Sequence, residues 1–149
     1  MTTRFDPTTH LAKGYEAVLR LETLVRGAVD HTLLELVKLR ASMVNGCAFC
    51  VDMHATDLLQ AGEDPRRVFA VAAWRESPFF TDLERAALAL TDAVTRLGED
   101  GVPDDVWDAV EKHVGTETAA HLVLAIATIN VWNRLAITAR KQPPDLEAA

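Results

Sequence analysis

The sequence predicts an all-α protein of about six to seven helices. Residues that cap helices recur along the whole chain, whereas alternating runs of β-branched residues, which are typical of strands, are nearly absent. The chain has 149 residues, of which 49% are hydrophobic and 25% charged, as expected for a folded globular protein. We therefore expect a single domain over residues 1–149.

Cap and turn residues set the expected helix boundaries in the first half of the chain. Asp30 is a candidate N-cap, and the Asn45-Gly46 pair is a turn that ends the helix that Asp30 begins. Gly62 suits the position just after a helix, and the Asp64-Pro65 pair is an N-cap followed by a proline in the first turn. The expected helices cover about residues 9–24, 30–44, 47–61 and 64–74.

The second half of the chain is bounded in the same way. Thr81 and Glu84 form a capping box, which predicts a helix over residues 81–98. The Val102-Pro103 pair begins a short helix that ends near Gly115. A long final helix is expected over residues 117–140, where Pro143 and Pro144 follow it.

Charge and hydropathy argue against several classes of partner. The net charge of −7 and the pI of about 5.1 disfavour an electrostatic grip on nucleic acid or anionic lipid. Residues 1–13 are polar and mixed, so no signal peptide is expected, and the most apolar stretch, Ala119 to Val131, is too short to span a bilayer. We expect a cytoplasmic protein without a nucleic-acid or membrane partner.

The helix expected over residues 30–44 is apolar around most of its circumference, which predicts a central, largely buried position. Lys38 and Arg40 have long side chains that are expected to reach water from it. Glu35 is shorter, and a buried carboxylate is costly unless it is paired. It is either a salt-bridge partner of a neighbour such as Lys38 or a functional acid or base.

The chain has two cysteines, Cys47 and Cys50, in a C-x-x-C pair. In a reducing compartment such a pair is either a redox dithiol or half of a metal site. At 100° per residue, His54 lies on the same helix face as both cysteines. The helix N-terminus favours the thiolate form of cysteines placed there.

The Asn45-Gly46 turn makes the two helices around it an antiparallel hairpin. Glu35 is then expected nearer to His54 than to the cysteines, which suggests a proton relay from Glu35 through His54 to Cys50. Other interpretations stay open. The cysteines could be core residues or a structural disulfide, or Cys47, Cys50 and His54 could bind zinc with Asp57 or Glu35 as the fourth ligand.

The stretch from Glu35 to His54, ELVKLRASMVNGCAFCVDMH, resembles the signature of the AhpD-like alkylhydroperoxidase and carboxymuconolactone decarboxylase family. That pattern is a Glu, eleven residues, C-x-x-C, three residues and a His. The resemblance extends to residues 72–88 and 129–134, and its signature core covers about residues 30–98. One departure is Phe49, which stands between the cysteines where the best-known hydroperoxidases have a second histidine.

The resemblance implies an AhpD-like helical domain that forms trimers or hexamers. It also implies a thiol-dependent peroxidase acting on hydroperoxides, in which Cys50 attacks the peroxide, Cys47 resolves it, and Glu35 and His54 relay protons. No metal or organic cofactor is required. An external thiol reductant, which in the family can be a lipoyl-bearing protein, restores the dithiol.

Two other functions remain possible. A cofactor-free decarboxylase-like enzyme would use Glu35 and His54 with the cysteines as bystanders, and a thiol–disulfide redox adaptor would cycle the cysteines without preferring peroxide.

Some further residues have only a structural expectation or none. Trp132 and Ile137 are expected at an oligomer interface, the aromatic residues Trp74, Phe79 and Phe80 in the core or a subunit contact, and His121, Asn130, Asn133 and Arg134 have no assigned role.

Overall fold

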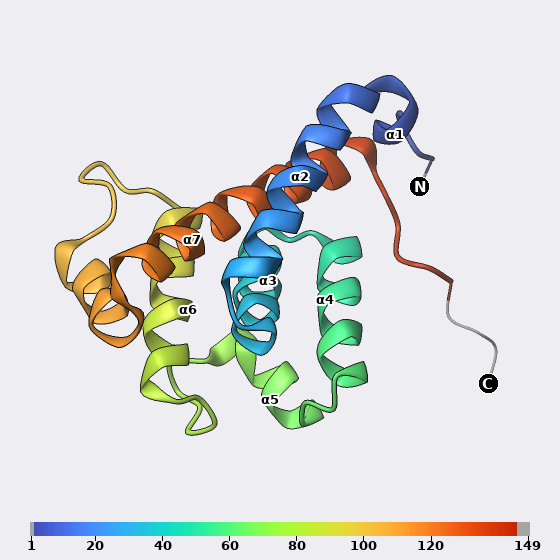
Figure 1. Ribbon diagram of the computed structural model, residues 1–149. Helices are drawn as coiled ribbons and strands as arrows, with labels where there is room; N and C mark the ends of the chain where they lie inside the picture. Colours follow the sequence, from blue (N-terminus) through green and yellow to red (C-terminus); the bar gives the residue numbers. More distant parts are fainter. Residues whose placement is uncertain (1, 146–149) are drawn as a thin grey trace.

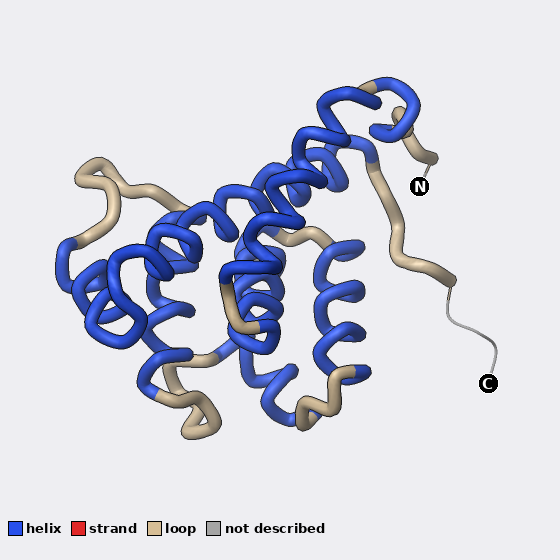
Figure 2. Tube along the Cα trace, viewed as in Figure 1, coloured by secondary structure: helices blue, strands red, loops and turns tan. Residues whose placement is uncertain are grey.

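Helices make up nearly all the regular structure of the computed structural model, which describes residues 2–145 (Figures 1 and 2). In chain order they are α1 (Pro7–His10), α2 (Ala12–Ala28), α3 (His31–Asn45), α4 (Ala48–Gln60), α5 (Pro65–Ala70), the 3₁₀ helix η1 (Val71–Ala73), α6 (Asp82–Thr95) and α7 (Asp104–Ala139). No β-strand lies in this described part of the chain. The all-α prediction is confirmed.

Helix α3 is the centre of the structure and packs against α4, α6 and α7 (Figure 1). It begins at the expected cap, because the Asp30 side chain accepts a hydrogen bond of 3.0 Å from the Leu33 backbone N–H. It ends at Gly46, whose φ of 71° lies in the left-handed region that glycine adopts without strain. Its central, buried position and the helical hairpin with α4 are confirmed.

Two apolar clusters surround α3. The first joins α3 to the end of α2, to α6 and to α7, and it includes Leu34, Leu90 and Ile126. The second joins α3 to α4, α5, η1 and α6, and Trp74 and Phe80 belong to it. These two aromatic residues are therefore core residues, as expected, while Phe79 is half-buried.

The N-terminal region differs from the single helix expected over residues 9–24. It forms two helices, because Leu11 leaves the helical conformation between α1 and α2. Helix α1 begins with an Asp6 cap followed by Pro7, the same signal that correctly predicted the start of α5. The backbone N–H of Arg4 donates to the carbonyl oxygen of Ala139 (3.0 Å), so the N-terminal segment lies against the end of α7.

Helix α7 is long but not uniform. At Gly115 the backbone has φ 76° and ψ 164°, which are not helical values, so two helical segments meet there. This agrees with the helix end expected near Gly115. The helix as a whole is long and apolar enough to cross a membrane, unlike the stretch from Ala119 to Val131 alone. Length and composition alone are weak evidence for a membrane span, because core helices of soluble proteins meet the same criterion. In α7, 44% of the apolar window is buried inside the structure.

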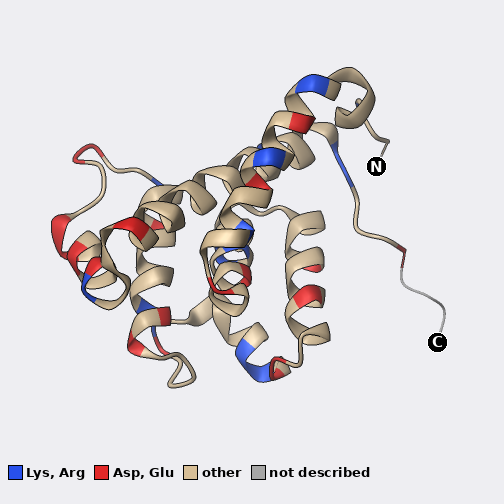
Figure 3. Cartoon of the chain, in the orientation of Figure 1, with Lys and Arg blue, Asp and Glu red and all other residues tan. Residues whose placement is uncertain are grey.

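Acidic residues gather on the loop before α7 and on the first turns of that helix, and they are coloured red in Figure 3. They are Glu99, Asp100, Asp104, Asp105 and Asp108. In the common view of the figures, this acidic end lies on the opposite side of the molecule from α4.

Candidate active site

The cysteine pair lies where the α3–α4 hairpin turns. Cys47 is the N-cap of α4, and its Sγ accepts a hydrogen bond of 3.4 Å from the backbone N–H of Cys50. The two residues are joined by a disulfide and are buried beside Ala136 of α7. The turn therefore presents both sulfur atoms to the C-terminal half of α7.

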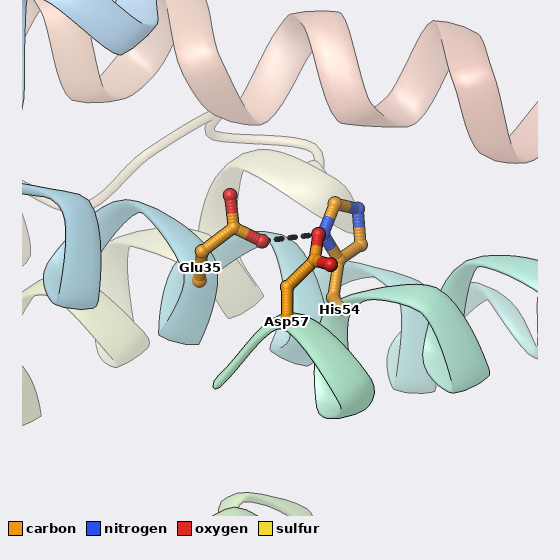
Figure 4. Close-up of side chains that lie close together, drawn as sticks. All are labelled: Glu35, His54 and Asp57. Atoms are coloured by element: carbon orange, nitrogen blue, oxygen red, sulfur yellow. Dashed lines mark hydrogen bonds and ion pairs between the residues drawn. The ribbon is translucent and has the colours of Figure 1, made fainter. Parts of the chain in front are cut away.

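His54 and Glu35 meet across the hairpin (Figure 4). The Nδ1 atom of His54 on α4 lies 2.6 Å from Oε2 of Glu35 on α3, and both side chains are buried. An ionised carboxylate can only accept, so Nδ1 carries the proton of this hydrogen bond. The other ring nitrogen, Nε2, is buried and has no hydrogen-bond partner within residues 2–145. The hairpin geometry expected from the sequence is present, and it leaves one imidazole nitrogen unpaired.

The charge state of Glu35 follows from its neighbours. Burial acts to raise its pKa, but the hydrogen bond from His54 and the charges of His54, Lys38 and Arg26 outweigh burial and lower the pKa from 4.5 to about 2. Glu35 is therefore a carboxylate at neutral pH. It is paired with a neighbouring cation, Lys38, as the first interpretation of this residue expects, while its role as a functional acid or base stays a prediction.

The expectation that Lys38 reaches water is wrong. Its side chain is fully buried, and its ammonium donates to Oε1 of Glu22 and lies 3.5 Å from Oε1 of Glu35. Two carboxylates replace the water that a charged amine requires. Arg40 keeps only 15% of its side chain exposed and donates from Nε to Asp92 over 2.6 Å.

A pocket of about 720 Å³ reaches this site from outside. Cys50 and His54 line its wall, whereas Cys47 and Glu35 do not. The remaining wall comes from Phe49 and Met53 of α4, from residues 3–8, from α2 and α7, and from the segment after α7. Trp132, expected at an interface between subunits, packs at an angle against Tyr15 in this wall, with 4.9 Å between ring centroids. Of the two cysteines, Cys50 is therefore the one that borders the pocket.

The position of the cysteine turn depends on residues to which the sequence assigned no role. The Asn45 side-chain amide donates to Oδ1 of Asn130 (2.9 Å) and of Asn133 (2.8 Å) on α7. Asn133 is buried and donates in turn to the hydroxyl of Ser42 (3.0 Å), whose carbonyl accepts from the Cys47 backbone N–H. The available signal in the sequence was a pair of asparagines one turn apart, at the end of the most apolar stretch of α7.

We expect Asn133→Ala to lower the free energy of unfolding by about 1–3 kcal/mol, because it takes one hydrogen-bond partner from the buried Ser42 hydroxyl and one from the half-buried Asn45 amide. Urea unfolding followed by circular dichroism measures this change. The matched control is Thr138→Ala, an exposed position on the same helix. Equal effects from the two substitutions would contradict the proposed anchoring of the turn.

One cluster in the described part of the chain could approach a metal ion. Ligand atoms of Glu35, His54 and Asp57 lie within 4.8 Å of one another (Figure 4). Glu35 is already paired with Lys38 at 3.5 Å and with Arg26 at 3.7 Å, and both positive charges oppose a bound cation. The cysteines are bonded to each other and are not part of this cluster. The residues therefore fit a charge-paired network better than a metal centre.

Comparisons with known proteins identify a family and several relatives of this chain. The sequence profile of the carboxymuconolactone decarboxylase family matches residues 10–93. The uncharacterized protein YdfG of Bacillus subtilis is 37% identical over 126 residues, which cover 84% of this chain and 86% of YdfG. Alkyl hydroperoxide reductase AhpD of Coxiella burnetii is 38% identical over 58 residues, but these cover 36% of this chain and only 33% of AhpD.

Solved structures show the same fold. A protein of unknown function from Agrobacterium tumefaciens, associated in its description with the antioxidant defence protein AhpD, superposes with a TM-score of 0.93 at 39% identity. The match covers 97% of this chain and all of that one. The debrominase Bmp8 has a TM-score of 0.75 at 21% identity over 86% of this chain and 69% of its own, which indicates a shared fold alone.

Proposed function

The chain belongs to the carboxymuconolactone decarboxylase family, and within it we propose an AhpD-like thiol peroxidase that reduces hydroperoxides with Cys47 and Cys50. One observation carries the proposal. Cys50 and His54 line the pocket, while Cys47 is bonded to Cys50 and is not part of the lining. The site thus offers a nucleophile, a base with an unpaired nitrogen and a second thiol, which together suit stepwise thiol oxidation.

The first step oxidises Cys50. His54, through Nε2, takes the proton of the Cys50 thiol, and the thiolate attacks the terminal oxygen of the hydroperoxide. The O–O bond breaks as the S–O bond forms, so Cys50 becomes a sulfenic acid and the leaving alkoxide receives the proton from His54. The peroxide is reduced by two electrons to an alcohol, or to water if it is hydrogen peroxide.

The second step closes the cycle. The Cys47 thiol attacks the Cys50 sulfenic acid and releases water, which gives the disulfide seen in the structure. An external dithiol then reduces this disulfide by exchange and is itself oxidised. We propose a thiol reductant of this class, a lipoyl-bearing protein being one example, and no metal or organic cofactor takes part in these steps.

The proposed assembly is a homo-oligomer, a trimer or a hexamer. Apolar side chains on the outside of α2 and α7 support it, because Leu24 is 48% exposed, Ile137 44% and Val131 39%. Light scattering in solution measures the mass directly, and a monomer would contradict this part of the proposal.

The experiment that tests the peroxidase is intact-mass spectrometry of the reduced protein after one equivalent of cumene hydroperoxide. We expect a loss of about two daltons within seconds, since a dithiol becomes a disulfide. Hydrogen peroxide in a parallel sample compares a small peroxide with an organic one. Free thiols that persist for minutes in both the cumene hydroperoxide and the hydrogen peroxide sample would contradict the proposal and favour acid–base chemistry by Glu35 and His54.

A further inference from the structure

A chain of charged side chains runs from His54 away from the cysteines. Behind the His54–Glu35 hydrogen bond, Oε1 of Glu35 lies 3.5 Å from the ammonium of Lys38 and 3.7 Å from the guanidinium of Arg26. Lys38 also donates to Oε1 of Glu22, and Arg26 donates to the same oxygen over 2.8 Å. Two carboxylates and two cations thus form one network on α2 and α3, with His54 at its end.

Lys38 is the most deeply placed cation of this network. Its side chain is fully buried, whereas 46% of the Arg26 side chain is exposed and water weakens its charge. A buried carboxylate beside an imidazole, with no cation behind it, stabilises the charged imidazolium. An imidazolium held permanently in that form cannot take a proton from a thiol.

We propose that Lys38 is a positioning residue that offsets the charge of Glu35, so that His54 can both accept and release a proton at the bottom of the pocket. This inference rests on the proposed peroxidase function, because only a reaction that moves a proton through His54 needs the offset. Glu22 completes the arrangement by holding the ammonium from the other side. Lys38 itself touches neither the pocket nor the cysteines.

Other charged groups face His54 from the surrounding elements. On α4 itself, the half-buried Asp57 offers an oxygen close to the imidazole. Asp6 of the N-terminal segment and Lys141 after α7 lie on the wall of the same pocket, and both are exposed to water, which screens their charges. Lys38 and Glu35 are the fully buried charges of the network, and Glu22 holds the Lys38 ammonium. Substitutions at Lys38 and at Glu22 should therefore shift the His54 titration midpoint in opposite directions.

The test follows the His54 imidazole by NMR titration in the disulfide form, with the resonance assigned by its loss in His54→Gln. We expect Lys38→Met to move the titration midpoint to higher pH by about one unit, because a buried positive charge is lost. Glu22→Gln removes a negative charge and should move the midpoint to lower pH. Lys112→Met, at an exposed position on α7, is the matched control and should change nothing.

A purely structural role could not produce opposite shifts from two neighbouring substitutions. If Lys38→Met does not fold, the Glu22→Gln midpoint still decides, and a midpoint that stays at the wild-type value in the folded variants overturns the inference. The titration uses neither peroxide nor free thiols, so it is independent of the peroxidase assay. In that assay, the pH below which peroxide-driven disulfide formation slows should shift in the same direction as the His54 midpoint of each variant. Wild-type protein that does not react with peroxide would contradict the proposed function and leave the titration result unaffected.

Discussion

Peroxide-driven oxidation is expected to disappear in Cys50→Ser, with a fall in rate on the order of a thousand-fold or more, because the attacking sulfur is removed. Cys47→Ser should behave differently. Cys50 can still attack, but no second thiol resolves the sulfenic acid, so the protein should gain about sixteen daltons and keep them. Intact-mass spectrometry after one equivalent of cumene hydroperoxide separates the two variants in a single experiment.

The contrast between the two serine variants tests the direction of the chemistry. The pocket reaches Cys50 and not Cys47, so the assignment of roles depends on this access. If Cys47→Ser were inert and Cys50→Ser gained oxygen, Cys47 would be the attacking residue. Neither substitution should unfold the protein, since serine is close to cysteine in size and the cysteines belong to a small cluster with Ala136 and Phe49. Circular dichroism of both variants provides that control.

The second large effect is expected at Glu35. Glu35→Gln leaves the buried ammonium of Lys38 with one charged partner in place of two, and it should lower the free energy of unfolding at pH 7 by about 3–5 kcal/mol. The matched control is Glu16→Gln, because Glu16 is 72% exposed and contacts Arg20 at 3.9 Å on the surface. That substitution should cost less than about 1 kcal/mol.

The effect of Glu35→Gln should depend on pH in a defined direction. The folded protein lowers the pKa of Glu35 from 4.5 to about 2, so the stabilisation is complete above pH 4.5 and is lost as the pH falls towards 2. The difference between wild type and variant should therefore shrink by about 3 kcal/mol over that range. Urea unfolding at pH 7, 4, 3 and 2 measures it. A difference that is constant with pH would show that the Glu35 charge does not stabilise the fold.

Local sequence patterns predicted those parts of the structure that depend on neighbours along the chain. Asp30, Thr81 and the Asn45-Gly46 turn set helix ends through contacts a few residues long, and all act as expected. The meeting of Glu35 with His54 followed from helix geometry and one tight turn. Each inference needed only the fixed rise and rotation of a helix.

Features that depend on distant segments were missed. The burial of Lys38 requires Glu22, which comes from a helix sixteen residues earlier and whose packing no local pattern reveals. The same holds for Asn45 and its partners on α7, eighty-five and eighty-eight residues later. The pocket wall formed by residues 3–8 depends on contacts with the far end of the chain. By contrast, the start of α1 depends on a local signal, because the Asp6 side chain caps the helix and Pro7 is its first residue.

The sulfur that caps α4 also changes oxidation state in the proposed cycle. Sγ of Cys47 accepts from the Cys50 backbone N–H, so the first turn of the helix is tied to the redox chemistry of that atom. A thermodynamic cycle then links two quantities. If the disulfide and the thiol stabilise the first turn of α4 to different extents, that difference in free energy changes the reduction potential of the cysteine pair by the same amount. The difference in hydrogen-exchange rate of the Cys50 amide between the oxidised and reduced protein therefore measures how strongly the cap and the redox state are coupled.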